Sequence, residues 1–253
     1  MTLARTMVSI GGLYVGLALG AVRRGVHWAR ATVVSSATAG FFSFFLFLGF
    51  GYFDPFHAFV TAILFQFLLL ALYAPVGTYR PMPYPELTDD DVWRRGQWGQ
   101  LLFVGIGAGL VGAGIVIASI GSGGVFVRED LDYLRTSIEA LRAANPRLIP
   151  VVAHDRASLG GMLIANGLAV WLAAQWGFAG GARWLWWTMV VSGTPAFVAA
   201  IGVHLAVGYT DAWHLAPAFA GAGLFVLAAA LTRGWLCRPE SSRREAWEAL
   251  RAG

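Results

Sequence analysis

The string GYFDPFH at residues 51–57 decides the fold, because it returns 157 residues later as GYTDAWH at residues 208–214. Gly, Tyr, Asp and His are identical in the two strings. Weaker matches precede both strings in the same order: Ser9, Gly11 and Gly12 match Ser158, Gly160 and Gly161, Gly25 and Trp28 match Gly181 and Trp184, and Val34 and Ser35 match Val191 and Ser192. Ordered self-similarity of this kind indicates a duplicated unit. We therefore predict two copies of one structural unit.

Each copy contains three long apolar segments, and a seventh segment lies between the copies. A helix of about 20 apolar residues crosses the roughly 30 Å hydrocarbon layer of a bilayer. Such segments occupy residues 7–22, 31–53, 55–74, 101–120, 157–177, 184–207 and 213–231, the first being short and supported by its match to the fifth. A single intervening helix gives both copies the same orientation. The predicted fold class is an all-α integral membrane protein with about seven transmembrane helices in a 3+1+3 parallel internal repeat.

The composition and the charge distribution agree with a membrane location. The chain is 57% hydrophobic and 13% charged, whereas soluble domains are about one quarter charged. Arg23 and Arg24 follow the first segment directly, and twelve of the eighteen basic residues fall on the same side of the membrane as they do. Cytoplasmic loops are enriched in such charges. We expect the N-terminus outside and the C-terminus inside a bacterial-type cytoplasmic membrane, and no nucleic-acid partner.

The duplication divides the chain into five parts: the first three-helix repeat at 1–75, an inner loop and linker helix at 76–121, an outer loop with an amphipathic helix at 122–156, the second three-helix repeat at 157–236, and an inner C-terminal tail at 237–253. In the outer loop, apolar residues from Leu131 to Leu141 recur at helical spacing, which predicts one short surface helix ending near Asn145. In the inner loop, the acidic run at 89–91 predicts a capped start for the helix leading into the fourth span.

The two GYxDxxH strings support two interpretations. Asp54 and Asp211 stand where helices begin, so both can cap a helix and leave His57 and His214 in its first turn. Alternatively, these residues join His154 and His204 at one depth on the outer side. Histidine and carboxylate ligands suit copper, zinc or iron, and histidine also binds haem. The candidate metal ligands are His57, His154, His204, His214, Asp54 and Asp211.

The chain carries no motif that indicates an enzyme. The glycine pattern at 107–112 fits GxGxxG, but it lies inside an apolar span, where it favours helix packing over nucleotide binding. Gly105 and Gly109 extend a smooth face that suits a linker or an oligomer contact. We therefore expect a non-catalytic subunit or scaffold in the lipid bilayer, in contact with a partner membrane protein or a homo-oligomer. One alternative is a metal- or haem-binding redox component that uses the outer His/Asp residues.

A third interpretation is a small-solute transporter. The 3+1+3 parallel layout is similar to the arrangement of the SWEET sugar transporters, although no sequence motif is shared with them. Transporters with internal repeats often break corresponding helices in both halves. Here Pro195 corresponds to Thr38 and Pro217 to Val60, so the two halves do not share their helix-breaking residues.

Overall fold

The computed structural model describes residues 2–49, 55–73, 86–87, 89–239 and 241–252, and the regular structure within them is helical. The helices are α1 (Thr2–Gly20), the 3-10 turn η1 (Val22–Arg24), α2 (His27–Gly49), α3 (Pro55–Tyr73), α4 (Asp91–Ser122), α5 (Arg128–Leu134), α6 (Ile138–Ala144), α7 (Leu148–Gly177), α8 (Arg183–Val207), α9 (Ala212–Leu236) and α10 (Ser241–Ala252). Five helical segments of this described part are long and apolar enough to cross a membrane: Thr6–Arg24, α4, α7, α8 and α9. The all-helical, membrane-type fold is confirmed at that level.

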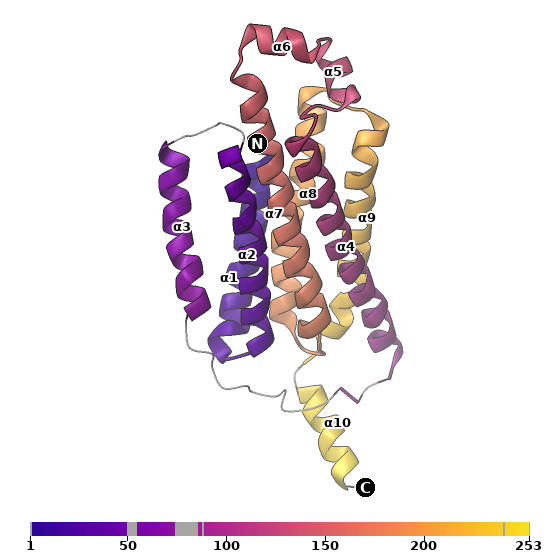
Figure 1. Ribbon diagram of the computed structural model, residues 1–253. Helices are drawn as coiled ribbons and strands as arrows, with labels where there is room; N and C mark the ends of the chain where they lie inside the picture. Colours follow the sequence, from indigo (N-terminus) through magenta and orange to yellow (C-terminus); the bar gives the residue numbers. More distant parts are fainter. Residues whose placement is uncertain (1, 50–54, 74–85, 88, 240, 253) are drawn as a thin grey trace.

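The long helices run roughly side by side, and the two ends of the bundle differ (Figure 1). The start of α1 lies at the same end as α5 and α6, which we call the loop end. Helix α10 lies at the opposite end, beyond the bundle. The chain therefore passes through the bundle an odd number of times.

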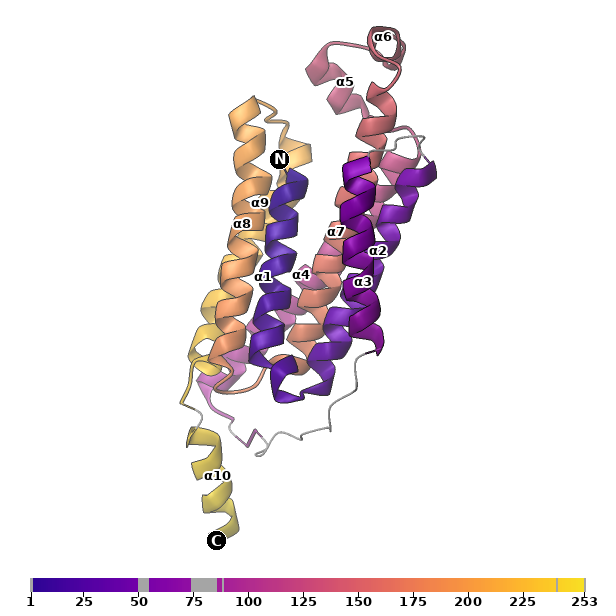
Figure 2. The same cartoon turned by 90° about the vertical axis from the view of Figure 1, so that its left-hand side faces the viewer.

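Helices that are far apart in the sequence pair crosswise. Helix α1 packs along α8, α2 packs along α7, and α4 packs against both α7 and α9. Figure 2 shows α1, α8 and α9 on one side of the bundle and α2, α3 and α7 on the other. Side chains added at Gly12, Gly16 and Gly20 would collide with Ser192, Thr188 and Trp184 of α8. Glycine thus permits the close approach of α1 and α8 along their whole contact.

Glycines also bring α4 and α7 into backbone contact. A Cβ atom at Gly114 would lie 2.5 Å from the carbonyl oxygen of Gly160, and one at Gly167 would lie 2.6 Å from that of Gly107. Small residues at such crossings let backbones approach, and this packing stabilises helix pairs in lipid, where no hydrophobic driving force acts between helices. A larger residue in place of Gly114 or Gly167 would push the two helices apart.

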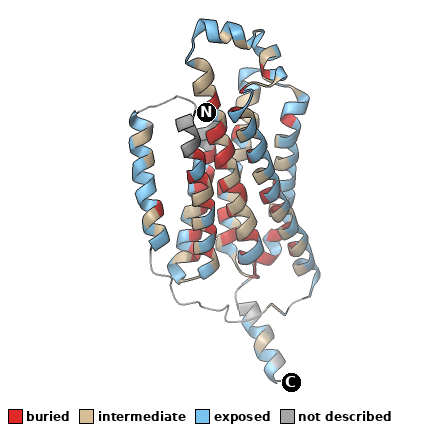
Figure 3. Ribbon diagram, in the orientation of Figure 1, coloured by how far each residue is buried: buried red, intermediate tan, exposed pale blue. Residues whose placement is uncertain are grey.

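Helix α3 has a different environment from the central helices. It packs against α2, and among its side chains that the structure describes Leu68 is buried whereas most others are exposed (Figure 3). Near its C-terminal end, the Arg30 guanidinium donates hydrogen bonds to the carbonyl oxygens of Ala71 at 2.9 Å and Leu72 at 3.1 Å. A cation there complements the helix dipole. Helix α3 therefore offers nearly its whole apolar surface to its surroundings.

Two local signals in the loops can be compared with the structure. Asp90 caps α4 as the acidic run predicts, since its side chain accepts a hydrogen bond from the Trp93 N–H at 2.7 Å. The outer loop holds two short helices instead of one. Arg135 adopts a left-handed conformation that ends α5, and Ser137 caps α6 by accepting from the Ala140 N–H. The apolar spacing continues across this break, which is why it resembles a single helix in the sequence.

Candidate functional site

The second GYxDxxH string forms a tight turn at the loop end of the bundle. Gly208 ends α8 with a φ of 76°, a left-handed conformation that glycine adopts without strain. Asp211 then starts α9, because its carboxylate accepts a hydrogen bond from the His214 N–H at 2.7 Å. The turn consequently places His204, in the last turn of α8, beside His214, in the first turn of α9.

The two imidazoles are in direct contact. Their Nε2 atoms lie 3.1 Å apart, and their ring centroids lie 5.0 Å apart. The Nδ1 atom of His204 lies 2.6 Å from the Ala200 carbonyl oxygen. A carbonyl only accepts hydrogen bonds, so Nδ1 of His204 carries a proton, and in the neutral ring Nε2 is left as an acceptor. The Nε2–H of His214 then donates to it.

Two tyrosines extend this pair toward α5. The Tyr209 ring packs against His214, with centroids 4.7 Å apart, and against Tyr133, with centroids 4.8 Å apart. The Tyr133 hydroxyl donates to the Val207 carbonyl oxygen at 2.5 Å. We call His204, His214, Tyr209 and Tyr133 the imidazole–tyrosine cluster. It attaches the outer loop to the turn between α8 and α9.

A partly buried ion pair between Asp130 and Arg156 contacts the cluster through Tyr209. The Asp130 carboxylate accepts hydrogen bonds from the Arg156 guanidinium at 2.6 Å, the Val127 N–H at 2.9 Å and the Tyr209 hydroxyl at 3.3 Å. Burial, and then the neighbouring charge of Asp130, raise the pKa of Tyr209 to about 12. The phenol is therefore protonated, and a hydrogen-bond donor, at any physiological pH.

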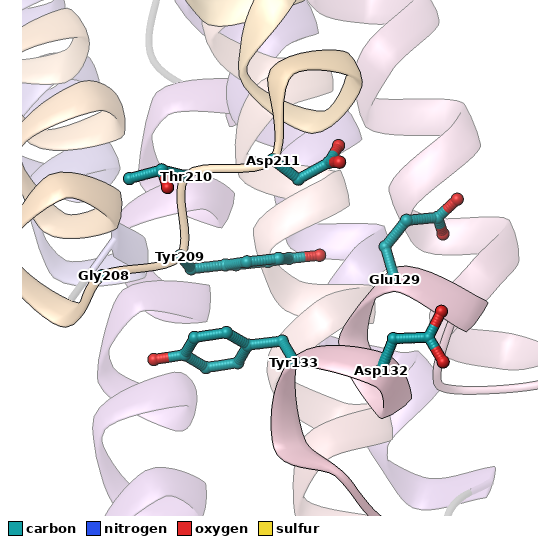
Figure 4. Close-up of a pocket in the computed structure, with 7 residues that line it drawn as sticks. All are labelled: Glu129, Asp132, Tyr133, Gly208, Tyr209, Thr210 and Asp211. Atoms are coloured by element: carbon teal, nitrogen blue, oxygen red, sulfur yellow. The ribbon is translucent and has the colours of Figure 1, made fainter.

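A shallow pocket of about 410 Å³ opens beside the cluster, lined by Glu129, Asp132, Tyr133, Gly208, Tyr209, Thr210 and Asp211. Figure 4 shows the Tyr133 and Tyr209 rings next to each other, with the carboxylates of Glu129, Asp132 and Asp211 gathered on one side. Asp132 also pairs with Arg128 at 3.5 Å, in an exposed contact. The pocket surface is thus acidic and aromatic.

The six predicted metal ligands have different outcomes. His204 and His214 come together, whereas Asp211 serves as the N-cap of α9. His154 is buried on α7. Asp54 and the side chain of His57 lie outside the described residues. Among the described side chains, no group of three or more His, Cys, Asp or Glu is arranged to hold a metal ion.

Sequence reasoning missed the remaining members of the site. Asp130 and Arg156 are 26 residues apart, in different helices, and no local pattern links them. Tyr209 belongs to the repeated string, so its position carried a signal, but its contact with Tyr133 depends on how α5 folds back. The chain matches no family profile, no curated protein and no solved structure in the three comparisons made.

Proposed function

We propose that the chain is a non-catalytic scaffold subunit of the membrane, with seven spans in two parallel three-helix repeats, which associates with a second copy through the outward face of α4. In this proposal α2 and α3 also cross the bilayer. The N-terminus and the loop end face outward, and α10 lies inside.

Helix boundaries support the duplication. One constant offset of 157 residues relates Gly20 to Gly177 at the ends of α1 and α7, and Pro55 to Ala212 at the starts of α3 and α9. The same offset relates His27, the start of α2, to Trp184, the second residue of α8. No gap is needed. The crosswise pairs α1–α8 and α2–α7 are then the same contact made twice about a two-fold axis.

A buried polar contact lies where such an axis would pass. The Ser9 hydroxyl donates to the Asn166 side-chain oxygen at 3.1 Å, and these residues are 157 positions apart. Asn166 in turn donates to the Thr6 and Met162 carbonyl oxygens. Equivalent positions of two related units can touch only close to the axis that relates them. This contact therefore supports a two-fold arrangement of the halves.

The packing between the halves is the observation that carries the scaffold function. Gly12, Gly16 and Gly20 lie directly against α8, without space for a Cβ. Two shallow pockets of the described residues lie elsewhere: one at the loop end, the other at Gln97, Gln100, Leu101, Val104 and Gln175 of α4 and α7. Tight seams hold the halves together and favour a rigid subunit over a moving one.

The outward face of α4 is the proposed contact between copies. Gly105, Gly109 and Gly112 follow one another at spacings of four and three, and nothing lies within 4 Å of a Cβ built on any of them. Exposed aliphatic side chains flank them, among them Leu101 and Ile115. Small residues four apart on an apolar helix form a common dimerisation surface. The opposite glycine face of α4 is already occupied by α7.

The test is self-association in liposomes, measured by energy transfer between donor- and acceptor-labelled copies at increasing dilution in lipid. We expect the wild-type chain to associate and Gly109→Leu to reduce association about tenfold or more, because the new side chain blocks the close approach. Gly223→Leu is the matched control. Gly223 is also exposed and open, but Phe219 and Leu227 stand four residues away on either side. Monomeric wild-type protein, or equal effects of the two substitutions, would contradict the proposal.

A small-solute transporter is the second candidate, favoured by the same two-fold pairing of parallel halves. A carrier must separate its halves during each cycle, whereas a scaffold does not. The test is a double variant, Gly12→Cys with Ser192→Cys, in a Cys237→Ser background. A Cβ atom added at residue 12 would lie 3.4 Å from the Cβ of residue 192. This distance is near the range of a disulfide, so oxidation should link α1 to α8. Flux into vesicles that stops on oxidation would favour the transporter. No flux above protein-free vesicles would favour the scaffold.

A further inference from the structure

We infer that His204 and His214 form a binding site for a divalent transition-metal ion, with Cu²⁺ as its tightest ligand, at the loop end of the bundle. The site is independent of the scaffold function. It uses two imidazoles, one from each side of the turn between α8 and α9, and water completes the coordination.

The distance between the rings suits two ligands of one ion. Metal–imidazole bonds of about 2.0–2.1 Å and the 3.1 Å separation of the Nε2 atoms give an N–metal–N angle of about 100°. That angle lies between the right angle of square or octahedral sites and the tetrahedral value. Both geometries are available to transition-metal ions. The nitrogen atoms therefore need no large movement to bind.

The distance between the ring centroids agrees with this geometry. The nitrogen of an imidazole lies roughly 1.15 Å from the ring centre. Two imidazoles bound to one ion at this angle would therefore have ring centroids about 4.8 Å apart. Two rings that point straight at each other, with the same distance between their nitrogen atoms, would have centroids about 5.4 Å apart. The observed separation is 5.0 Å. The observed separation is nearer to the value for a shared ion, so the two rings are spaced as two ligands of one ion require.

Hydrogen bonding prepares His204 as a ligand. Metal-binding histidines almost always donate their other ring N–H to a carbonyl or carboxylate, which fixes the tautomer and the ring orientation. His204 does so through Nδ1 to the Ala200 carbonyl oxygen at 2.6 Å. Its Nε2 is consequently a lone-pair donor directed away from α8. His214 becomes the second ligand when its proton moves from Nε2 to Nδ1 through water.

The surroundings favour a cation. Asp211 lies at the start of α9, and Glu129 and Asp132 line the adjoining pocket. Two arginines near these acidic residues are themselves paired, Arg156 with Asp130 and Arg128 with Asp132. His214 is exposed, so the ion and its waters can reach the pair from the surface. Nitrogen ligands give Cu²⁺ the highest affinity among the first-row divalent ions.

The experiment is a Cu²⁺ titration of the purified chain carrying no histidine tag, with bound metal counted after equilibrium dialysis and the nitrogen ligands read by electron paramagnetic resonance. We expect one equivalent of Cu²⁺ with hyperfine structure from two imidazole nitrogens. His204→Asn or His214→Asn should each weaken binding at least tenfold and leave one imidazole, and the double variant should bind no specific ion. His27→Asn is the matched control, since His27 is an exposed histidine at the opposite end of the bundle.

Folding of each variant is checked by its elution profile and thermal transition in detergent, so that lost binding is not mistaken for lost structure. A well-folded His204→Asn protein that binds Cu²⁺ as tightly as the wild type would overturn the inference. Substoichiometric binding by the wild type, or a spectrum with fewer than two imidazole nitrogens, would do the same.

Discussion

Removing Arg156 should release α5 from the bundle. Its partner Asp130 is 9% exposed as a side chain, whereas Arg156 itself is 24% exposed. Breaking a buried pair by removing one partner costs about 3–5 kcal/mol, because the other charge remains uncompensated. In Arg156→Met, Asp130 keeps two donors, the Val127 N–H and the Tyr209 hydroxyl, so we expect the lower end, about 3 kcal/mol.

The reciprocal change should be milder. In Asp130→Asn the remaining charge belongs to Arg156, whose partly exposed guanidinium can bind water instead. The expected loss is about 1.5 kcal/mol, the value of a hydrogen bond to a charged group. The unequal cost of the two substitutions follows from the unequal burial of the two partners.

Hydrogen exchange of the α5 amides measures both effects. About 3 kcal/mol corresponds to roughly 150-fold faster exchange in Arg156→Met, and about 1.5 kcal/mol to roughly tenfold in Asp130→Asn. Arg128→Met is the matched control, because the Arg128–Asp132 pair is exposed and worth less than about 1 kcal/mol. Exchange in Arg156→Met that is no faster than in Arg128→Met, or slower than in Asp130→Asn, would refute the reasoning.

Three further predictions concern the rest of the chain. Gly114→Val should destabilise the α4–α7 seam by about 3 kcal/mol, whereas Gly223→Val, in open space and outside the proposed contact between copies, should leave the thermal transition in detergent unchanged. Hydrogen bonds from the Trp93 N–H and then from Arg238 hold the pKa of Asp90 below its ordinary value. The ionised carboxylate therefore stabilises the fold fully at a pH above the ordinary pKa. This stabilisation is lost as the pH falls through the lower pKa of the folded state. Asp90→Asn keeps a capping side chain, so the melting difference from wild type should be present at pH 7 and shrink as the pH falls below the ordinary range of a carboxylate pKa. Finally, an impermeant maleimide applied to intact cells should not label Cys237 of the wild type. It should label residue 137 of the Ser137→Cys variant in a Cys237→Ser background. The reverse pattern would show that the chain has the opposite orientation to the one proposed.

The features that the sequence predicts well are local. The apolar lengths of α4, α7, α8 and α9 follow from composition alone, and Asp90 and Asp211 cap helices because a short carboxylate before an apolar run can do little else. The approach of His204 to His214 is also a local property, since four residues of turn separate two helix ends. Such features depend on few dihedral angles.

The remaining features depend on tertiary packing. The break at Arg135 divides α5 from α6 although the apolar spacing continues through it, because docking of Tyr133 on Val207 fixes where α5 must end. The Asp130–Arg156 pair joins residues that no periodicity relates. The two faces of α4 are indistinguishable in the sequence, since both contain glycine. The positions of α7 and α9 determine which glycines are buried.

The crosswise pairing also constrains how the protein is made. Helix α1 leaves the ribosome well before its main partner α8, which starts at Arg183. About 160 residues of synthesis separate them, on the order of 10 s at 5–20 residues per second. During that interval the glycine face of α1 lacks the α8 side chains that it contacts in the folded bundle. Helix α1 can therefore complete its packing only after α8 has been synthesised.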